Sequence, residues 1–196
     1  MADAAAQLMT IEQFLDWQKA QESLFELVDG VPVAYRGAEM MSGGSSLHDR
    51  IITNIIMALG NQLGDGPCRP ATADLALRTK IKSLRRADVL VTCDPPRGDL
   101  YEAVDPRMVV EVLSPSNVGV AWERKLVEYR RHAKLDYILL VDARVIDVSL
   151  YTRTPADWDD TDYVTTDDVV ALPKLMCKLS LAAIYRGTGL AGDGPA

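Results

Sequence analysis

The sequence predicts an α/β (α+β) fold in which a mixed β-sheet is flanked by helices. Segments 87–93 and 108–113 are almost continuously apolar, as is typical of strands covered on both faces. An amphipathic segment at 121–133 follows the second of them and leads to a further apolar strand at 137–141. A helix between two buried strands is typical of a crossover connection, so we expect helices packed on the sheet.

The N-terminal elements are predicted from capping and turn chemistry. Thr10 is a suitable N-cap for a short amphipathic helix over 11–21. Segment 25–35 is predicted to form a β-hairpin, because Asp29 and Gly30 at its centre readily take the positive φ angles of a tight turn. The segment that follows the hairpin is predicted to be a loop.

The rest of the chain completes one domain. Pro32 confines the second hairpin strand to a sheet edge, because proline has no N–H for a further strand partner. The other predicted elements are a helix from Ser46 to a stop at Gly64 and strands at 74–81 and 145–151, the last of which closes the sheet or forms its edge. A length of 196 residues fits one domain better than two. We expect a single domain over 1–196, with a core at 10–155, a C-terminal extension at 156–196 and a flexible tail at 187–196.

Cysteine content and hydropathy indicate the compartment. The three cysteines are widely spaced and form no CxxC motif, which argues against a disulfide framework and against a zinc site. No apolar run approaches the roughly 18 residues that a membrane helix needs. The N-terminus does not resemble a secretory signal. We therefore expect a soluble cytoplasmic protein without a membrane partner.

Charge is unevenly distributed. The net charge of -7 speaks against a protein that binds nucleic acid with its whole surface, since that affinity comes from neutralised phosphates. Two basic runs nevertheless stand out: Arg78, Lys80, Lys82, Arg85 and Arg86, and then Arg124, Lys125, Arg130, Arg131 and Lys134. Each run is either a solvated face or, where it flanks a site, a contact with a phosphate backbone.

Two acids on neighbouring apolar strands are the strongest sign of chemistry. Glu111 lies inside a buried strand, where an unpaired carboxylate costs several kcal/mol and needs a cation or a proton. Asp88 lies at the start of the preceding apolar strand. If the strands are adjacent, both carboxylates, with water and the Val112 carbonyl, can bind Mg²⁺. The alternatives are a strand-edge Glu111 in water or paired with an arginine, and a turn role for Asp88.

Lys125 is the third candidate. It lies on the predicted helix after the Glu111 strand, between Trp122 and Tyr129, so it borders the buried side of that helix. Its stem can follow apolar surface and bring the ammonium to the carboxylates, where it can steady an attacking water or the charge on a phosphate. The alternative is a surface lysine beside Arg124.

Several segments in order resemble one known family. They are FELVDG at 25–30, MSGGSSLH at 41–48, ADVLV at 87–91, VVEVLSPS at 109–116, ERKLVEYRRH at 123–132 and DYILLVD at 136–142. Together they resemble the Uma-two family of restriction-endonuclease-like proteins, a bacterial branch of the PD-(D/E)XK nuclease superfamily. The resemblance covers roughly residues 10 to 155, and the order of the segments makes it more specific than any one of them.

The resemblance implies a restriction endonuclease-like fold and a set of site residues. A divalent metal is expected on Asp88 and Glu111, with Lys125 as the catalytic lysine on the helix after the strand. Glu26 and His48 match a further acid and a histidine of the family. The alternatives are a surface acid in the hairpin for Glu26 and a first-turn helix residue contacting its neighbours for His48.

The sequence departs from the family at two positions. Ala87 replaces the usual proline before the first acid, and Leu113 stands where a strand lysine is usual. The first change leaves the carboxylate in place. The second leaves Lys125 as the sole lysine for catalysis, so the site depends on the direction in which Lys125 points.

Three functions remain open from the sequence. The first is an endonuclease that uses Mg²⁺, with Mn²⁺ as a substitute, to hydrolyse phosphodiester bonds of nucleic acid, with DNA preferred as the substrate. The second is a catalytically inactive binding or assembly module of the same fold, and the third is an unrelated acid-based hydrolase. No GxSxG, Walker or HExxH motif supports the common alternatives. We also expect a homodimer through the 25–35 hairpin and the strand near Tyr151, because pairing supplies a second cutting centre.

Overall fold

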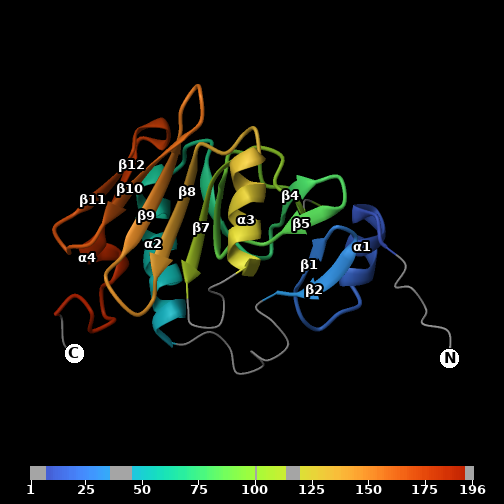
Figure 1. The fold of residues 1–196 in the computed structure, drawn as a ribbon, viewed down its shortest axis with the longest axis horizontal. Coiled ribbons are helices and arrows are strands. Elements are labelled where there is room, and N and C mark those ends of the chain that lie inside the picture. Colours follow the sequence, from blue (N-terminus) through green and yellow to red (C-terminus); the bar gives the residue numbers. More distant parts are fainter. Residues whose placement is uncertain (1–7, 36–45, 100, 114–119, 193–196) are drawn as a thin grey trace.

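A computed structural model describes residues 8–35, 46–99, 101–113 and 120–192 of the chain (Figure 1). The loop predicted after the hairpin and the SPS part of the VVEVLSPS motif lie outside these residues. The helices are α1 (Ile11–Gln18), α2 (Ser46–Leu63), α3 (Val120–Arg131), α4 (Leu181–Ile184) and the short 3-10 helix η2 (Pro173–Leu175). None of the helices in this part of the chain is long and apolar enough to cross a membrane.

A six-stranded sheet forms the centre, in the order β10-β9-β8-β7-β6-β3. Its strands are β3 (Arg69–Thr72), β6 (Val89–Thr92), β7 (Pro106–Leu113), β8 (Tyr137–Asp142), β9 (Val148–Arg153) and β10 (Trp158–Tyr163). β7 and β8 are parallel, whereas every other neighbouring pair in this sheet is antiparallel. A parallel pair needs a crossover, and α3 provides it, so the predicted mixed sheet is confirmed.

Helices α2 and α3 lie on opposite faces of the six-stranded sheet (Figure 1). Alternate side chains of β7 point to opposite faces of the sheet and join two different cores. Val110 and Val112 pack with Ile51 and Ile55 of α2, whereas Val109 packs on the side of α3 with Tyr129, which is fully buried. This period of two explains why the central strands are apolar throughout.

A second sheet has the order β2-β1-β5-β4 and lies beside the first one (Figure 1). Its strands are β1 (Phe25–Val28), β2 (Val31–Ala34), β4 (Leu77–Lys80) and β5 (Ser83–Arg85). The turn between β1 and β2 has φ of 49° at Asp29 and 89° at Gly30, as the Asp-Gly pair predicted. Strand β2, with Pro32, is at the edge, as predicted.

Helix α1 covers the second sheet through Ile11 and Phe14, which pack with Leu27 of β1. Its N-terminus is the predicted one. The side chain of Thr10 accepts a hydrogen bond from the amide of Gln13 and the side chain of Gln13 bonds back to Thr10, a complete capping box. The helix ends at Gln18, before the predicted limit at residue 21.

The C-terminal part differs from the expectation. Strand β10, not the strand near Tyr151, forms the edge of the large sheet, because the acidic segment after β9 pairs with β9. Strands β11 (Val169–Leu172) and β12 (Cys177–Ser180) form a hairpin that packs with α2 and α4. Their buried side chains join the core on the α2 face, so the core extends beyond residue 155. Residues 187–192 of the predicted tail follow α4 as turns and bends.

A disulfide joins Cys68 to Cys93, contrary to the expectation from cysteine spacing. The register of β3 against β6 pairs Arg69 with Thr92, so the two cysteines face each other one residue further along the ladder. Strand β3 was not predicted, and without it the spacing of 25 residues gives no sign of the pairing. Cys177 is a free, buried cysteine.

Candidate active site

Asp88 and Glu111 lie opposite each other on neighbouring strands. Val89 of β6 pairs with Val110 of β7 in antiparallel register, so Asp88, one residue before Val89, lies across from Glu111. The backbone amide of Val112 donates a hydrogen bond of 2.8 Å to Oδ2 of Asp88 and so fixes this carboxylate against β7. Asp88 is 3% exposed and Glu111 is 5% exposed. The predicted convergence of the two acids is present.

Glu111 is held by two side chains of α3 through the same oxygen. Tyr129 donates its hydroxyl to Oε1 at 2.7 Å, and Nζ of Lys125 lies 2.7 Å from Oε1. Oε2 accepts no hydrogen bond from any residue in the described part of the chain. Burial raises the pKa of Glu111 to about 7; Lys125 opposes this rise and the neighbouring Asp88 adds to it.

Lys125 points into the molecule. Its ammonium lies 2.7 Å from Oε1 of Glu111 and 3.1 Å from Oε1 of Glu26, and it donates to the carbonyl of Arg86 at 2.6 Å. These three partners match its three N–H donors. Burial lowers the pKa of Lys125, but the carboxylates of Glu111 and Glu26 outweigh burial, so the net shift is upward. The alternative of a surface lysine is therefore wrong.

Asp88 is surrounded by donors from three separate segments. Tyr35, which follows β2, donates its hydroxyl to Oδ1 at 2.7 Å, and Nε2 of His48 on α2 lies 3.4 Å from Oδ2. Burial raises the pKa of Asp88, but these contacts and the Val112 amide outweigh it and hold the pKa well below its usual range. The carboxylate is thus stabilised as the anion. His48 is buried and contacts Asp88 directly.

Glu26 belongs to the same network through Lys125. Its side chain is buried, and it accepts hydrogen bonds from the Arg86 amide at 2.8 Å and from Nη1 of Arg85 at 3.0 Å. Burial raises the pKa of Glu26, but the nearby cations Lys125 and Arg85 outweigh burial, so the net shift of the pKa is downward. Glu26 is thus not the surface acid of the alternative prediction. It holds Lys125 from the second sheet while Glu111 holds it from the first.

Two members of the first basic run, Arg85 and Arg86, are buried and bonded to protein groups, so they form neither a solvated face nor a contact surface for phosphates. Arg85 is buried between Glu26 and Glu128, and it bonds to both oxygens of Glu128, with Nε 2.7 Å from Oε2 and Nη2 2.9 Å from Oε1. Arg86 is also buried, and its guanidinium donates to the carbonyl groups of Phe25, Ala73 and Asp74. These two cations hold the second sheet in place.

The site offers few protein ligands for a metal. Within the described residues no group of three or more His, Cys, Asp or Glu side chains is arranged to hold a metal ion. Two opposed carboxylates are present, and Oε2 of Glu111 is not used by a described residue. Mg²⁺ commonly takes one or two protein carboxylates and keeps water or substrate oxygens in its other positions. Asp88 and Glu111 fit that donor set.

Sequence reasoning did not assign Tyr35 or the Arg85–Glu128 pair to this region. Tyr129 was noted only as a neighbour of Lys125 on the helix, although its spacing of four residues from Lys125 predicts that both reach the same partner. Nothing in the spacing of Tyr35 indicates a contact with Asp88, because 53 residues separate them.

The sheet with a helix on each face and the opposed acids at adjacent strands define a protein of the restriction endonuclease-like fold. The chain belongs to the Uma2 family, described as "Putative restriction endonuclease", whose model matches residues 11–183. The resemblance seen in the sequence is therefore confirmed.

Individual relatives agree with this assignment. An uncharacterised protein of Synechocystis sp. is 30% identical over 179 residues, which cover 90% of this chain and 90% of that protein. A second one from the same organism is 25% identical over 159 residues, 78% of this chain and 85% of that protein. The crystal structure of a putative nuclease from Anabaena variabilis has a TM-score of 0.70 and 16% identity, covering 90% of this chain and 97% of that one. This last likeness supports the fold.

Proposed function

We propose that the protein is a metal-dependent endonuclease that hydrolyses phosphodiester bonds of DNA. The observation that carries the proposal is the convergence of Asp88, Glu111 and Lys125, from two strands and a helix, at one buried point. The family is described as "Putative restriction endonuclease" and the Anabaena protein as a "putative nuclease", and both descriptions support this reaction class.

Asp88 and Glu111 would hold one Mg²⁺, for which Mn²⁺ can substitute, with the Val112 carbonyl as a third candidate ligand. When bound, such an ion activates water and neutralises charge on the phosphate. Tyr35 and His48 keep Asp88 oriented and anionic through their contacts with its two oxygens. Glu111 in its anionic form is needed for the same purpose, and Lys125 beside it favours that form.

Lys125 has to exchange a partner before it can reach substrate. All three of its N–H donors face protein acceptors, and the contact with Glu26, at 3.1 Å, is the longest of the three. A phosphate oxygen that replaces Glu26 as a partner would receive a charge-assisted hydrogen bond from Lys125. Glu26 is then a positioning residue that holds the ammonium in place between turnovers.

An inactive binding module of the same fold is the second candidate. Two observations favour it. All three N–H donors of Lys125 already have acceptors in the protein, and the net charge of -7 weakens attraction to nucleic acid. The two candidates differ in one measurable property, which is cleavage that depends on a divalent ion.

The test is nicking of supercoiled plasmid with Mg²⁺, with Mn²⁺ and with chelator, for the wild type and for Asp88→Asn, Glu111→Gln and Lys125→Met. We expect cleavage with metal only, and a loss of roughly 10²-fold or more in Lys125→Met, the size expected when one preorganised donor is removed. Glu123→Gln, an exposed change on the same helix, is the control and should cleave normally. Equal cleavage by Lys125→Met contradicts the role of Lys125. If the wild type binds DNA but cleaves it with neither metal, the binding module is correct.

A further inference from the structure

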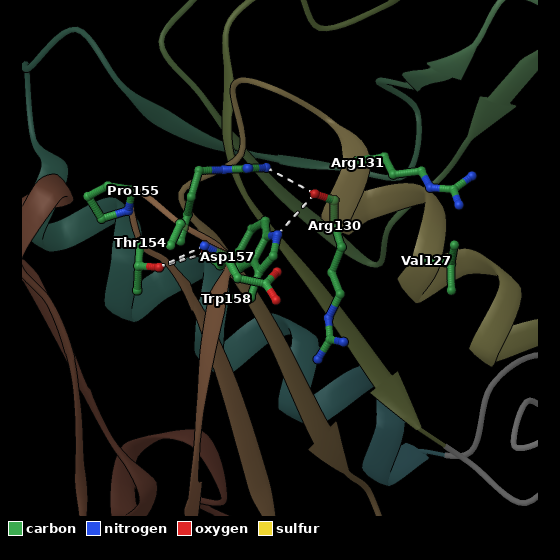
Figure 2. A pocket seen from close by; sticks show the side chains of 9 residues that line it. Val127, Arg130, Arg131, Thr154, Pro155, Asp157 and Trp158 are labelled. Carbon is green, nitrogen blue, oxygen red and sulfur yellow. Dashed lines mark hydrogen bonds between the residues drawn. The ribbon is translucent and has the colours of Figure 1, made fainter.

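A pocket of about 290 Å³ lies between the C-terminal half of α3 and the connection from β9 to β10 (Figure 2). Its lining combines the side chains of Arg130, Arg131 and Arg153 with the acid Asp157 and the apolar Val127 and Trp158. None of these residues takes part in the network around Asp88 and Glu111. In Figure 2 the side chain of Arg130 runs from α3 past Trp158, whereas Arg131 extends to the other side of the helix.

Arg130 is the unusual member of this pocket. Its guanidinium stacks on Tyr151, with Cζ 4.5 Å from the ring centroid. Its Nε is buried and, among the described residues, has no hydrogen-bond acceptor and no carboxylate within 4.0 Å. A buried donor without an acceptor is costly. By contrast, Arg85 and Arg124 of the same two basic runs each contact two carboxylates.

The end of α3 next to the pocket does not repel an anion as an open helix C-terminus would. The last carbonyl groups of a helix carry a partial negative charge. Here Arg153 donates to the carbonyls of Leu135 at 2.5 Å and Arg130 at 3.2 Å, and Nε1 of Trp158 also donates to that of Arg130, at 2.9 Å. Arg153 in turn stacks on Trp158 at 4.3 Å. Three arginines, Arg130, Arg131 and Arg153, line the pocket together with one acid, Asp157, so its lining carries a net positive charge.

We infer that this pocket binds one nucleotide of a nucleic-acid strand, with the phosphate on Arg130 at the rim. The volume is near the lower end for small-ligand sites, roughly 300 Å³, which exceeds the needs of a bare phosphate. Val127, Pro155 and Trp158 provide apolar surface for a sugar and base. The inference rests on the proposed function, and it adds a substrate contact outside the catalytic centre.

The pocket and the catalytic lysine lie on different sides of α3. Lys125 and Arg130 are five residues apart, which is about 7.5 Å along the axis and about 140° around it. A strand that reaches both points has to pass around α3, so its path is longer than the axial distance. Arg130 would therefore contact a nucleotide several steps away from the one being cleaved.

Binding in the presence of chelator tests the inference without cleavage. The anisotropy of a labelled 12-nucleotide single strand is titrated at several salt concentrations with the wild type, Arg130→Met and Arg186→Met. Methionine keeps apolar contact with Tyr151, and thermal denaturation checks the fold of each variant. Arg186 is an exposed arginine after α4, on the other face of the sheet, and serves as the matched control.

We expect Arg130→Met to raise the Kd about tenfold or more, the usual effect of one hydrogen bond to a charged group. The slope of log Kd against log salt should fall by about 0.7 for one lost contact with a single strand. Arg186→Met should bind as the wild type does. An unchanged Kd in Arg130→Met overturns the inference, as does a failure of the wild type to bind the strand.

Two further arms separate the sources of the signal. A deoxynucleoside monophosphate should bind far more weakly than the strand; if it binds as tightly, the pocket is a site for a free nucleotide and a strand site is excluded. A wild type that binds through Arg130 but cleaves nothing with metal supports the pocket and contradicts only the proposed nuclease activity.

Discussion

Replacing Glu128 tests whether the first basic run serves the fold. Glu128 is 2% exposed and accepts two hydrogen bonds from Arg85 and one from Thr79 at 2.8 Å. Burial raises its pKa, but these hydrogen bonds outweigh burial and lower the pKa from 4.5 to about 2. At 1.36 kcal/mol for each unit of pKa, this difference means that the ionised Glu128 contributes about 3 kcal/mol to the free energy of unfolding.

Glu128→Gln removes that anion and leaves Arg85 buried with Glu26 as its remaining carboxylate partner. Breaking one side of a buried ion pair typically costs about 3–5 kcal/mol, which is a large part of the roughly 5–15 kcal/mol of a domain. We expect a loss of about 3 kcal/mol in the free energy of unfolding at pH 7, measured by urea denaturation. Glu123→Gln, on the exposed side of α3, should change it by less than about 0.5 kcal/mol.

The pH dependence gives an independent check. Because the folded pKa lies below the unfolded one, the stabilisation by Glu128 is complete above pH 4.5 and is lost as the pH falls toward 2. Wild type and Glu128→Gln should therefore converge in stability in that window. If Glu128→Gln is as stable as the wild type at pH 7 and only its DNA affinity changes, Arg85 contacts phosphate and the structural assignment is incorrect.

Three other predictions concern Glu111, the disulfide and the exposed edge strand β2. In metal-free protein the pKa of Glu111 is raised from 4.5 to about 7, so the free energy of unfolding should fall as the pH rises from 4.5 to about 7. Glu111→Gln should remove this fall. A series of thermal melts across this pH range that shows no difference between the two proteins would contradict the prediction. Cys68→Ser should lower the free energy of unfolding by about 3.5 kcal/mol, since the disulfide closes a loop of 25 residues, and a reductant should lower the wild-type melting temperature but not that of the variant. A homodimer, if it forms through edge strand β2, should be lost on changing the exposed Val31 and Val33 to Lys, whereas a monomeric wild type in sedimentation velocity at micromolar concentration excludes it.

The elements that could be predicted from sequence are those with strong local signals. Thr10 with its capping partner, the Asp29-Gly30 turn and the apolar strands on both sides of α3 all follow from neighbours in the chain. The same is true of the opposed acids, because two consecutive buried strands place Asp88 and Glu111 at one point once they pair. Local chemistry and tertiary structure agree at these positions.

Long-range pairing is what the sequence could not provide. Strand β3 is short and contains Pro70, so its pairing with β6, and the disulfide beside it, gave no periodic signal. Strand β10 has exposed aspartates at three of its six positions and is held by its ladder with β9. The burial of Arg85 was missed for a similar reason, because its partners Glu26 and Glu128 are 59 and 43 residues away.

The ammonium of Lys125 spans two sheets, since Glu26 belongs to β1 and Glu111 to β7. The candidate site therefore lies where the two sheets meet, and it depends on their contact as much as on either sheet. A subglobal opening that separates the N-terminal hairpin from the large sheet would release one of the three partners of Lys125 while β6, β7 and β8 stay paired. Amide hydrogen exchange can detect such an opening as earlier exchange in β1 than in β7. Its free energy would set how often the site is assembled, independently of the global stability of the protein.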